Sequence, residues 1–308
     1  MENWPQPTKM TKNSFLSKLT ENAPLAKLTT FGIGGPAKFF TIVYSNKELI
    51  ETVKKARENK IKFFILGGGS NILVSDRGFA GLVIKINNNS LKNKGNTVTA
   101  QSGTRLSELV KFAAKKRLSG LEHLWGIPGT VGGAVVGNAG AKDCWIGQST
   151  TAVTVLNLNN QLINLKQKDC QFAYRTSRFQ NSQEIVIEAI FKLTPATPEK
   201  ITQKQSFFAE LKSSQPREKS AGSIFKNPPG DSAGRLIDQA GLKGQKIGGA
   251  QISFQHANFI INTNKASAQD VLALMRLVQK KVLIRFQIKL KPEIKLIGFT
   301  KSEITDII

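Results

Sequence analysis

The sequence predicts a protein of mixed α-helices and β-strands, divided into two or three domains. Its 308 residues are more than one ordinary domain needs and enough to bury a substantial core. Short strand-like segments and amphipathic helical patterns follow one another along most of the chain. The run TPATP, at residues 194–198, interrupts this pattern, and we expect a domain boundary there.

Periodicity and capping signals place the elements in order. Residues 1–24 read as a polar arm, and residues 28–44 as extended structure. Ser45 or Asn46 is a plausible N-cap for the first helix, and Ser267 with Asp270 gives a capping box for the last one. Listed by residue number, the expected helices are 46–60, 104–118, 199–213 and 267–286, and the expected strands are 61–66, 82–86, 97–101, 152–158, 161–165, 184–193 and 288–298.

Composition excludes several classes of protein. No apolar run approaches the roughly 18 residues of a membrane span, and the N-terminus lacks the apolar core of a signal peptide. The two cysteines, Cys144 and Cys170, have neither metal-ligand spacing nor a histidine cluster nearby. We therefore expect a cytoplasmic protein with no metal site, no disulfide framework and no membrane partner.

The charge is the unusual feature of the composition. Lys and Arg number 44 against 21 Asp and Glu, a formal net charge of +23. Nucleic-acid binding is the obvious suggestion, but the lysines are scattered and no stacking aromatics are interleaved with them. We expect no nucleic-acid partner and interpret the charge mostly as compositional bias, which would also attract small anionic ligands.

Residues 126–141, GIPGTVGGAVVGNAGA, form the most distinctive stretch. Six of the sixteen are glycine and none is charged. Repeated glycine argues against a helix, and the apolar Ile127, Val131, Val135 and Val136 argue against a disordered linker. Glycine is used where backbone approaches a ligand closely. A cofactor wall and a tightly packed core turn both fit this stretch.

A second glycine run, Gly67-Gly68-Gly69-Ser70-Asn71, directly follows the strand predicted at 61–66. Successive N–H groups in such a loop can form an anion-binding nest, with Ser70 and Asn71 as added donors. No Lys-Ser/Thr follows the glycines, and Ile72 occupies the last glycine position of a dinucleotide fingerprint, so neither nucleotide motif fits. A hairpin without a ligand remains the alternative.

Three polar constellations lie outside the glycine runs. Arg175, flanked by aromatics in CQFAYRTSRF, is either a carboxylate or phosphate clamp or a surface arginine packed on Phe172 or Phe179. Ser223, in AGSIFKNP, has no histidine in a hydrolase context, so it is a hydrogen-bond or proton donor or else a turn serine. Glu293 alternates with lysines in IKLKPEIKLIG, where a solvated strand glutamate is the simpler interpretation.

Taken together, the motifs resemble those of the UDP-N-acetylenolpyruvoylglucosamine reductase (MurB) family. The matching runs occur in order from residue 28 to residue 298: TTFGIGGPAKF, LGGGSNILVSDRGFAG, GIPGTVGGAVVGNAGA, FAYRTSRF, AGSIFKNP, HANFIIN and KPEIKLIG. The resemblance implies an α+β fold. It consists of an FAD-binding unit of the vanillyl-alcohol-oxidase (PCMH) type at 25–196, with two subdomains split near 85, and an α+β substrate domain at 197–308.

The resemblance also implies an activity. In similar enzymes NADPH reduces non-covalent FAD, and flavin N5 passes hydride to the β-carbon of the enolpyruvyl ether of UDP-N-acetylglucosamine, a small-molecule substrate. By motif match, Arg175 and Glu293 would stabilise the enolate and Ser223 would protonate the α-carbon. Tyr174, Lys226 and Asn227 would contact the substrate. The residues expected to contact FAD are Gly67, Gly68, Gly69, Ser70, Asn71, Gly126, Ile127, Pro128, Gly129, Thr130, Gly133, Asn138, Ala139 and Gly140.

The chain departs from the family pattern in places. Val136-Gly137-Asn138 stands where relatives usually carry methionine before the asparagine. No long insertion carrying a substrate-closing tyrosine follows Arg175, as in the shorter form of the family, so the covering of the diphosphate is left open. We expect a monomer. The alternatives are another FAD-dependent oxidoreductase of the same fold and a basic nucleic-acid-associated protein.

Overall fold

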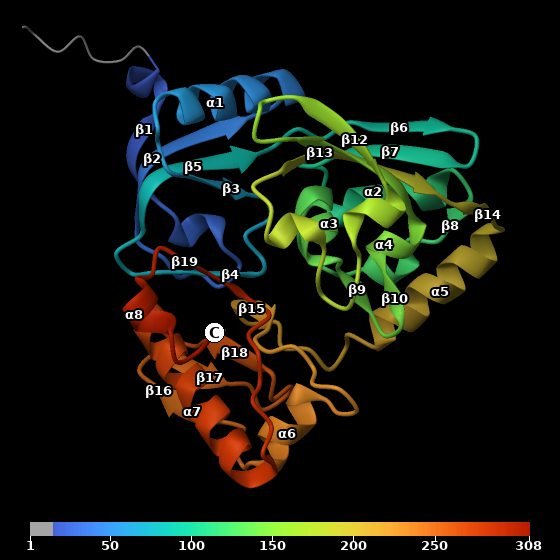
Figure 1. The fold of residues 1–308 in the computed structure, drawn as a ribbon. Coiled ribbons are helices and arrows are strands. Elements are labelled where there is room, and N and C mark those ends of the chain that lie inside the picture. Colours follow the sequence, from blue (N-terminus) through green and yellow to red (C-terminus); the bar gives the residue numbers. More distant parts are fainter. Residues whose placement is uncertain (1–14) are drawn as a thin grey trace, which may run out of the picture.

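Three β-sheets of four or five strands, each with its own helices, make up most of the computed structural model, which describes residues 15–308 (Figure 1). Residues 1–14 of the predicted arm lie outside the described residues. The end of the arm is structured, because Thr20–Pro24 forms a strand, β1. The mixture of helices and strands agrees with the predicted α+β class.

The first sheet carries the first glycine run at the end of one of its strands. Its order is β1-β2-β5-β3, with β1 antiparallel to β2 and the other pairs parallel. Ser45 caps α1 through its side chain, as predicted, by accepting from the N–H of Glu48. The elements are η1 (Leu16–Lys18), η2 (Ala26–Leu28), β2 (Pro36–Val43), α1 (Asn46–Glu58), β3 (Phe63–Leu66) and β5 (Phe79–Ile86).

The second sheet is antiparallel throughout, in the order β12-β11-β13-β7-β6. The strands predicted at 152–158 and 161–165 pair with each other as a hairpin, β11 with β12. The strands are β6 (Leu91–Lys94), β7 (Thr97–Gln101), β11 (Thr150–Leu156), β12 (Leu162–Lys166) and β13 (Ile185–Lys192), with the short pairs β8 (Leu118–Ser119) and β14 (Thr194–Pro195), and β9 (Gly140–Ala141) and β10 (Cys144–Trp145). The helices are α2 (Leu106–Lys115), η3 (Glu122–Leu124), α3 (Val131–Gly137), α4 (Ile146–Ser149), η4 (Gln167–Cys170) and η5 (Arg178–Gln180).

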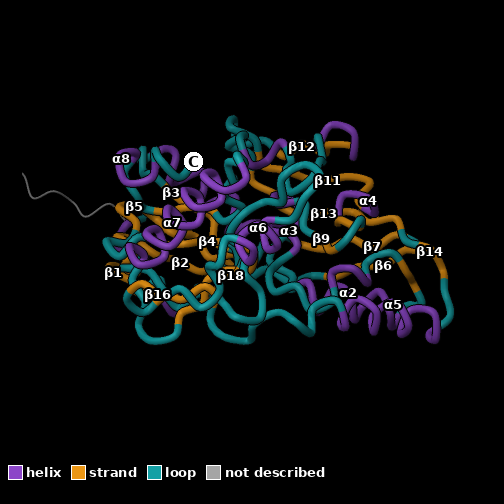
Figure 2. Tube along the Cα trace, turned by 90° about the horizontal axis from the view of Figure 1, so that it is seen from below, coloured by secondary structure: helices purple, strands orange, loops and turns teal. Residues whose placement is uncertain are grey.

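The third sheet, antiparallel in the order β15-β18-β17-β16, lies in the C-terminal part beside the long helix α7 (Figure 1). The predicted capping box of α7 is present, with Ser267 and Asp270 bonded reciprocally. Seen from below, α7 and α8 lie at one end of the molecule and α2 and α5 at the other (Figure 2). The elements are α5 (Pro198–Glu210), β15 (Ser220–Ser223), α6 (Ala233–Gln239), β16 (Lys246–Ile247), β17 (Ala250–Ile252), β18 (Phe259–Asn262), α7 (Ala268–Phe286) and α8 (Lys301–Ile304).

A parallel strand pair joins the segment after the first glycine run to a segment near the C-terminus. β4 (Ile72–Val74) follows the first glycine run, and β19 (Lys295–Ile297) pairs with it in register. Only these last residues of the strand predicted at 288–298 form a regular strand. The residues before them are bonded instead to the segment after β15, through an isolated bridge between Phe225 and Pro292. The change of partner occurs at Pro292, which has no N–H to donate to a strand ladder.

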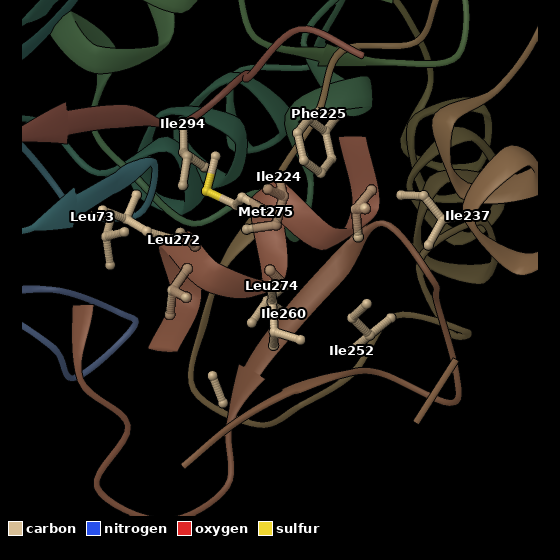
Figure 3. Close-up of a cluster of buried hydrophobic side chains, with 14 of the residues drawn as sticks. Leu73, Ile224, Phe225, Ile237, Ile252, Ile260, Leu272, Leu274, Met275 and Ile294 are labelled. Atoms are coloured by element: carbon tan, nitrogen blue, oxygen red, sulfur yellow. The ribbon is translucent and has the colours of Figure 1, made fainter. Parts of the chain in front are cut away.

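The C-terminal core takes in side chains from the first part of the chain. Leu73 of β4 lies beside Leu272 and the other apolar side chains of this cluster (Figure 3). Phe31 and Ile33, from the turn before β2, are buried in the same cluster. Of the extended structure predicted at 28–44, only the part from Pro36 is a regular strand. The residues before it form turns and irregular structure. The predicted domain limits near 85 and 196 stay predictions, and β5 ends at Ile86 before β6 opens the second sheet.

The glycine-rich stretch contains a helix, so the expectation that its glycines exclude one is wrong. Helix α3 occupies residues 131–137. Its residues Val131, Ala134 and Val135 are buried in the core of the second sheet. Their burial outweighs the low helix propensity of glycine, since packing of an apolar face supplies most helix stability in proteins.

Among the described residues, no helix is long and apolar enough to span a membrane.

Gly132 and Gly137 give a test of this packing. A Cβ at Gly132 would lie 2.8 Å from Cβ of Ser102, whereas one at Gly137 would meet nothing within 4 Å. Gly132→Ala should lower the free energy of unfolding by about 1–3 kcal/mol through overpacking. Gly137→Ala should leave it unchanged or raise it by up to about 1 kcal/mol. Urea denaturation of the ligand-free protein measures both, and equal stabilities would contradict the close packing of α3.

Candidate active site

Tyr174 and Arg175 form the tip of a tight turn. Ala173 and Thr176 exchange two backbone hydrogen bonds of 3.1 Å across it. Arg175 has a φ of +50°, a region that costs a residue with a Cβ about 1–2 kcal/mol. Strained backbone of this kind persists only where surrounding contacts hold it, and it is common at functional sites.

The Arg175 side chain connects this turn to two other segments. Its Nη2 donates to the carbonyl of Gly140 at 2.8 Å, and its Nε lies 3.0 Å from Oε1 of Glu293. The guanidinium also lies over the ring of Tyr174, 5.6 Å from its centroid. Nη1 has no hydrogen-bond acceptor among the described residues. The arginine is therefore a charged clamp with part of its fork free.

Glu293 is a largely buried acid whose ion-pair partner is an arginine. Its side chain is 18% exposed. Burial raises the pKa of Glu293 above its ordinary value of 4.5, and the positive charges of Arg175 and Lys226 offset only part of that effect. The simpler interpretation, a solvated strand glutamate paired with the lysines beside it, does not describe this environment.

Backbone pairing brings the Ser223 segment alongside Glu293. The N–H of Glu293 donates to the carbonyl of Ile224 at 2.8 Å, and the N–H of Lys226 donates to the carbonyl of Lys291 at 2.8 Å. Ser223 is the last residue of β15, one position before Ile224. Its hydroxyl has no hydrogen-bond partner among the described residues. Arg175, Glu293 and the Ser223 segment are thus brought together from three separate parts of the chain.

Two further predicted substrate contacts lie next to this group. The N–H of Asn227 donates to the Tyr174 hydroxyl at 3.3 Å, which connects the Arg175 turn to the C-terminal domain a second time. The Asn227 side-chain oxygen accepts from the N–H of Ala233 at 3.0 Å, so this atom caps α6. Only the amide nitrogen of Asn227 is left for a ligand. Lys226 is close enough to act electrostatically on Glu293.

The two glycine runs meet directly. A Cβ at Gly68 would lie 2.6 Å from Cα of Gly129, and one at Gly67 would lie 2.6 Å from Oγ1 of Thr130. Ser70 donates through its hydroxyl to the carbonyl of Pro128 at 2.8 Å. These glycines are therefore required because other protein atoms approach them, the backbone of Gly129 at Gly68 and the Thr130 side chain at Gly67.

Other glycines of the second run face open space. A Cβ at Gly133 would meet only Oγ1 of Thr130, at 3.7 Å, and one at Gly137 would meet nothing. The two are four residues apart, so they share one face of α3, opposite to Val131 and Val135. This face is a side-chain-free strip against which a flat ring system fits.

Free donors and cations surround the contact between the runs. The N–H groups of Gly68, Gly69, Ser70 and Asn71 have no acceptor among the described residues. The half-buried Lys85 donates to the carbonyl of Gly67, and burial, with a smaller effect of Arg105, lowers the pKa of Lys85. An anion-binding nest flanked by cations fits the pyrophosphate of FAD, as the strip on α3 fits its flavin ring.

Sequence reasoning missed three of the cations at this site. Lys85 lies on β5, and Arg105 pairs with Thr130 through an isolated backbone β-bridge. Neither residue belongs to a glycine motif. Lys295 is one of the lysines that alternate with Glu293. Burial lowers the pKa of Lys295, and its backbone N–H donates to the carbonyl of Asn71 at 3.0 Å. Its position two residues after Glu293, on the same side of the chain, was the available signal.

The remaining predicted FAD contacts are engaged mainly with protein. The buried Asn138 donates to the carbonyl of Ala173 at 2.8 Å and accepts from the N–H of Gly147 at 3.0 Å. Ala139 bonds to α3 and to Ile146 through its backbone, and Ile127 packs on the second core. Gly126 and Gly129 have positive φ. Among residues 15–308, no three His, Cys, Asp or Glu side chains are grouped to hold a metal ion.

Two family models match the chain. One, for the C-terminal domain of UDP-N-acetylenolpyruvoylglucosamine reductase, matches residues 215–297. The other, an FAD binding domain, matches residues 37–166 and so covers both glycine runs.

Related proteins match over almost the whole chain. The UDP-N-acetylenolpyruvoylglucosamine reductase of Caldanaerobacter subterraneus subsp. tengcongensis is 43% identical over 91% of this chain and 94% of its own length. That of Caldicellulosiruptor bescii is 43% identical over 93% of each. The crystal structure of the Thermus caldophilus enzyme (MurB) superposes with a TM-score of 0.81, at 37% identity, over 91% of this chain and 100% of that one. The chain therefore belongs to the UDP-N-acetylenolpyruvoylglucosamine reductase (MurB) family, and it is an FAD-dependent oxidoreductase.

Proposed function

We propose that this protein reduces the enolpyruvyl ether of UDP-N-acetylglucosamine to the lactyl ether of UDP-N-acetylmuramate, a step of peptidoglycan synthesis, with NADPH as the reductant. The observation that carries the proposal is the meeting of Arg175, Glu293 and the Ser223 segment, each from a different part of the chain. Relatives named for this substrate cover nearly the same length. The cytoplasmic location and monomeric state expected from the sequence stay predictions.

FAD would be held between the two glycine runs. The free N–H groups of residues 68–71, with Lys85 beside them, suit the pyrophosphate, and the strip at Gly133 and Gly137 suits the ring. The bound flavin supplies a hydride carrier that accepts from NADPH and donates to carbon. Gly126, Ile127, Pro128, Thr130, Ala139 and Gly140 would shape the pocket through their backbone.

Arg175 and Glu293 would stabilise the charge that develops on the substrate carboxylate and α-carbon. The free part of the Arg175 fork offers N–H donors to a carboxylate. Because its pKa is raised, Glu293 stays protonated to higher pH than an ordinary glutamate and can donate a hydrogen bond to the developing oxyanion. Their partial burial strengthens both interactions.

Ser223 would give its proton to the α-carbon. An enolate carbon is strongly basic, so a neutral hydroxyl without a basic partner is a competent donor. Lys226 and the free amide nitrogen of Asn227 would face the phosphates or sugar. Tyr174, whose hydroxyl lies beside Asn227, would contact the substrate next to them.

Anaerobic spectroscopy of the flavin tests the proposal and the role of Ser223 together. The wild-type protein should carry FAD, lose its visible absorption with NADPH and regain it when the enolpyruvyl substrate is added. Ser223→Ala should bleach normally, while its reoxidation by substrate should slow by about 100- to 10,000-fold, the usual contribution of a proton donor.

Two results would contradict this proposal. A folded wild-type protein that refuses added FAD, or whose reduced flavin ignores the substrate, removes the activity. Near-normal turnover of Ser223→Ala removes only its assignment as the donor.

The cofactor strip makes a separate prediction. A methyl at Gly133 clashes with nothing in the protein but would intrude on a bound ring. Gly133→Ala should weaken FAD binding by roughly 5- to 100-fold, the equivalent of about 1–3 kcal/mol of overpacking. The FAD-free variant should be as stable as the wild type or more stable by up to about 1 kcal/mol. Fluorescence titration with FAD measures the affinity, and Gly137→Ala, on the same strip, should weaken FAD binding in the same direction. Unchanged affinity in Gly133→Ala would place the ring elsewhere.

The raised pKa of Glu293 gives a pH dependence. The protonated acid is the active form of Glu293 in this mechanism. As pH rises through its raised pKa, Glu293 becomes a buried carboxylate that faces the carboxylate of the substrate. The rate of flavin reoxidation by substrate should therefore fall. Glu293→Gln keeps a neutral hydrogen-bond donor at this position, so the fall in rate at high pH should be absent from its pH–rate profile. Stopped-flow rates between pH 5 and about 9 distinguish the two. A limb that persists in Glu293→Gln would assign it to another group.

A further inference from the structure

Gln180 is placed to hold the strained turn that presents Arg175. It is the last residue of the short helix η5, five residues after Arg175. Its side-chain amide nitrogen donates to the carbonyl of Arg175 at 3.0 Å and also to the carbonyl of Val136 at 3.1 Å. One NH₂ group thus joins the Arg175 backbone to the last turn of α3, the helix with the side-chain-free strip.

The arginine needs such support because its backbone is unfavourable. The positive φ of Arg175 is rare for a residue with a Cβ, and the turn is closed only by the two backbone bonds between Ala173 and Thr176. Asn138 bonds to the carbonyl of Ala173, before the strained residue. Gln180 is the side chain that bonds to the carbonyl of Arg175 itself.

Relaxation of the backbone would move the guanidinium. The Nη2 bond to Gly140 and the 3.0 Å approach of Nε to Glu293 both depend on the direction in which the turn projects the side chain. Ser177 also donates to the carbonyl of Val136, at 2.7 Å, so the turn stays tied to α3 without Gln180. Loss of Gln180 therefore releases the conformation of Arg175 and leaves the local fold attached.

We propose that Gln180 is a positioning residue for catalysis, which holds Arg175 in its left-handed conformation and couples it to the cofactor-facing helix α3. This inference rests on the proposed function, in which Arg175 acts on the substrate and takes no part in flavin reduction. The two half-reactions therefore separate a positioning role from a general loss of structure.

The test compares Gln180→Met with Gln180→Glu in anaerobic stopped-flow experiments on the FAD-loaded protein. Methionine has a side chain of similar length without N–H donors. Glutamate keeps the shape of glutamine but places a carboxylate oxygen against the carbonyl oxygens of Val136 and Arg175. Both should be reduced by NADPH at the wild-type rate. Reoxidation by the enolpyruvyl substrate should fall about tenfold in Gln180→Met and further in Gln180→Glu, with Gln167→Met at the wild-type rate.

Gln167 is a control because its side-chain amide likewise donates to a backbone carbonyl, that of Gly147, which lies outside the Arg175 turn. Melting temperature and FAD content identify any variant that fails to fold. Gln180→Asn, whose shorter amide donates less well, then replaces it, and Gln180→Lys serves as a variant that retains an N–H donor. Wild-type reoxidation in the folded variants that lose or weaken donation, Gln180→Met, Gln180→Glu or Gln180→Asn, overturns the inference. A wild-type protein that does not reoxidise with this substrate overturns the proposed function instead.

Discussion

The parallel pairing of β4 with β19 is the constraint on which the candidate site depends. It binds a strand near the C-terminus to the strand that follows the first glycine run. The bond from Lys295 to Asn71 extends the pairing to the run itself, and Asp76 accepts from the N–H groups of Ala268 and Gln269 at the start of α7. Phe31, Ile33 and Leu73 are buried in the C-terminal core, so the first sheet and the C-terminal domain are held as one unit. Glu293 is therefore fixed relative to the expected phosphate loop.

Fixing charges at this junction has an energetic cost that points to function. A partly buried ion pair such as Arg175–Glu293 gains Coulomb energy but loses hydration, and it contributes little net stability. For Glu293 the effect of burial on the pKa exceeds that of its cationic neighbours. Neither the strained Arg175 nor the half-buried Lys85 and Lys295 is what packing alone would select. A site that must receive an anion and stabilise developing negative charge accounts for all of them.

Local signals in the sequence predicted those elements whose stability is local. Periodicity and capping residues predicted helices α1 and α7, and periodicity predicted the two strands that pair as β11 and β12. Helix α3 was not predicted because its stability comes from burial of its apolar face. The strand predicted at 288–298 is longer than the observed one because its residues change pairing partners at Pro292. The resemblance named Arg175, Ser223 and Glu293, but only the fold brings such distant residues together. Lys85 and Arg105 carry no motif that could have marked them.

The glycines of residues 126–141 divide into two kinds, and this division supports a cofactor wall more specifically than their number does. Gly129 and Gly132 are needed because other protein atoms approach them, as a core turn would require. Gly133 and Gly137 have no such neighbour, yet each lowers the stability of a buried helix relative to alanine. Packing alone offers no reason to keep them bare. A face kept free of side chains at a cost in stability is best explained by a ligand that must lie flat against it.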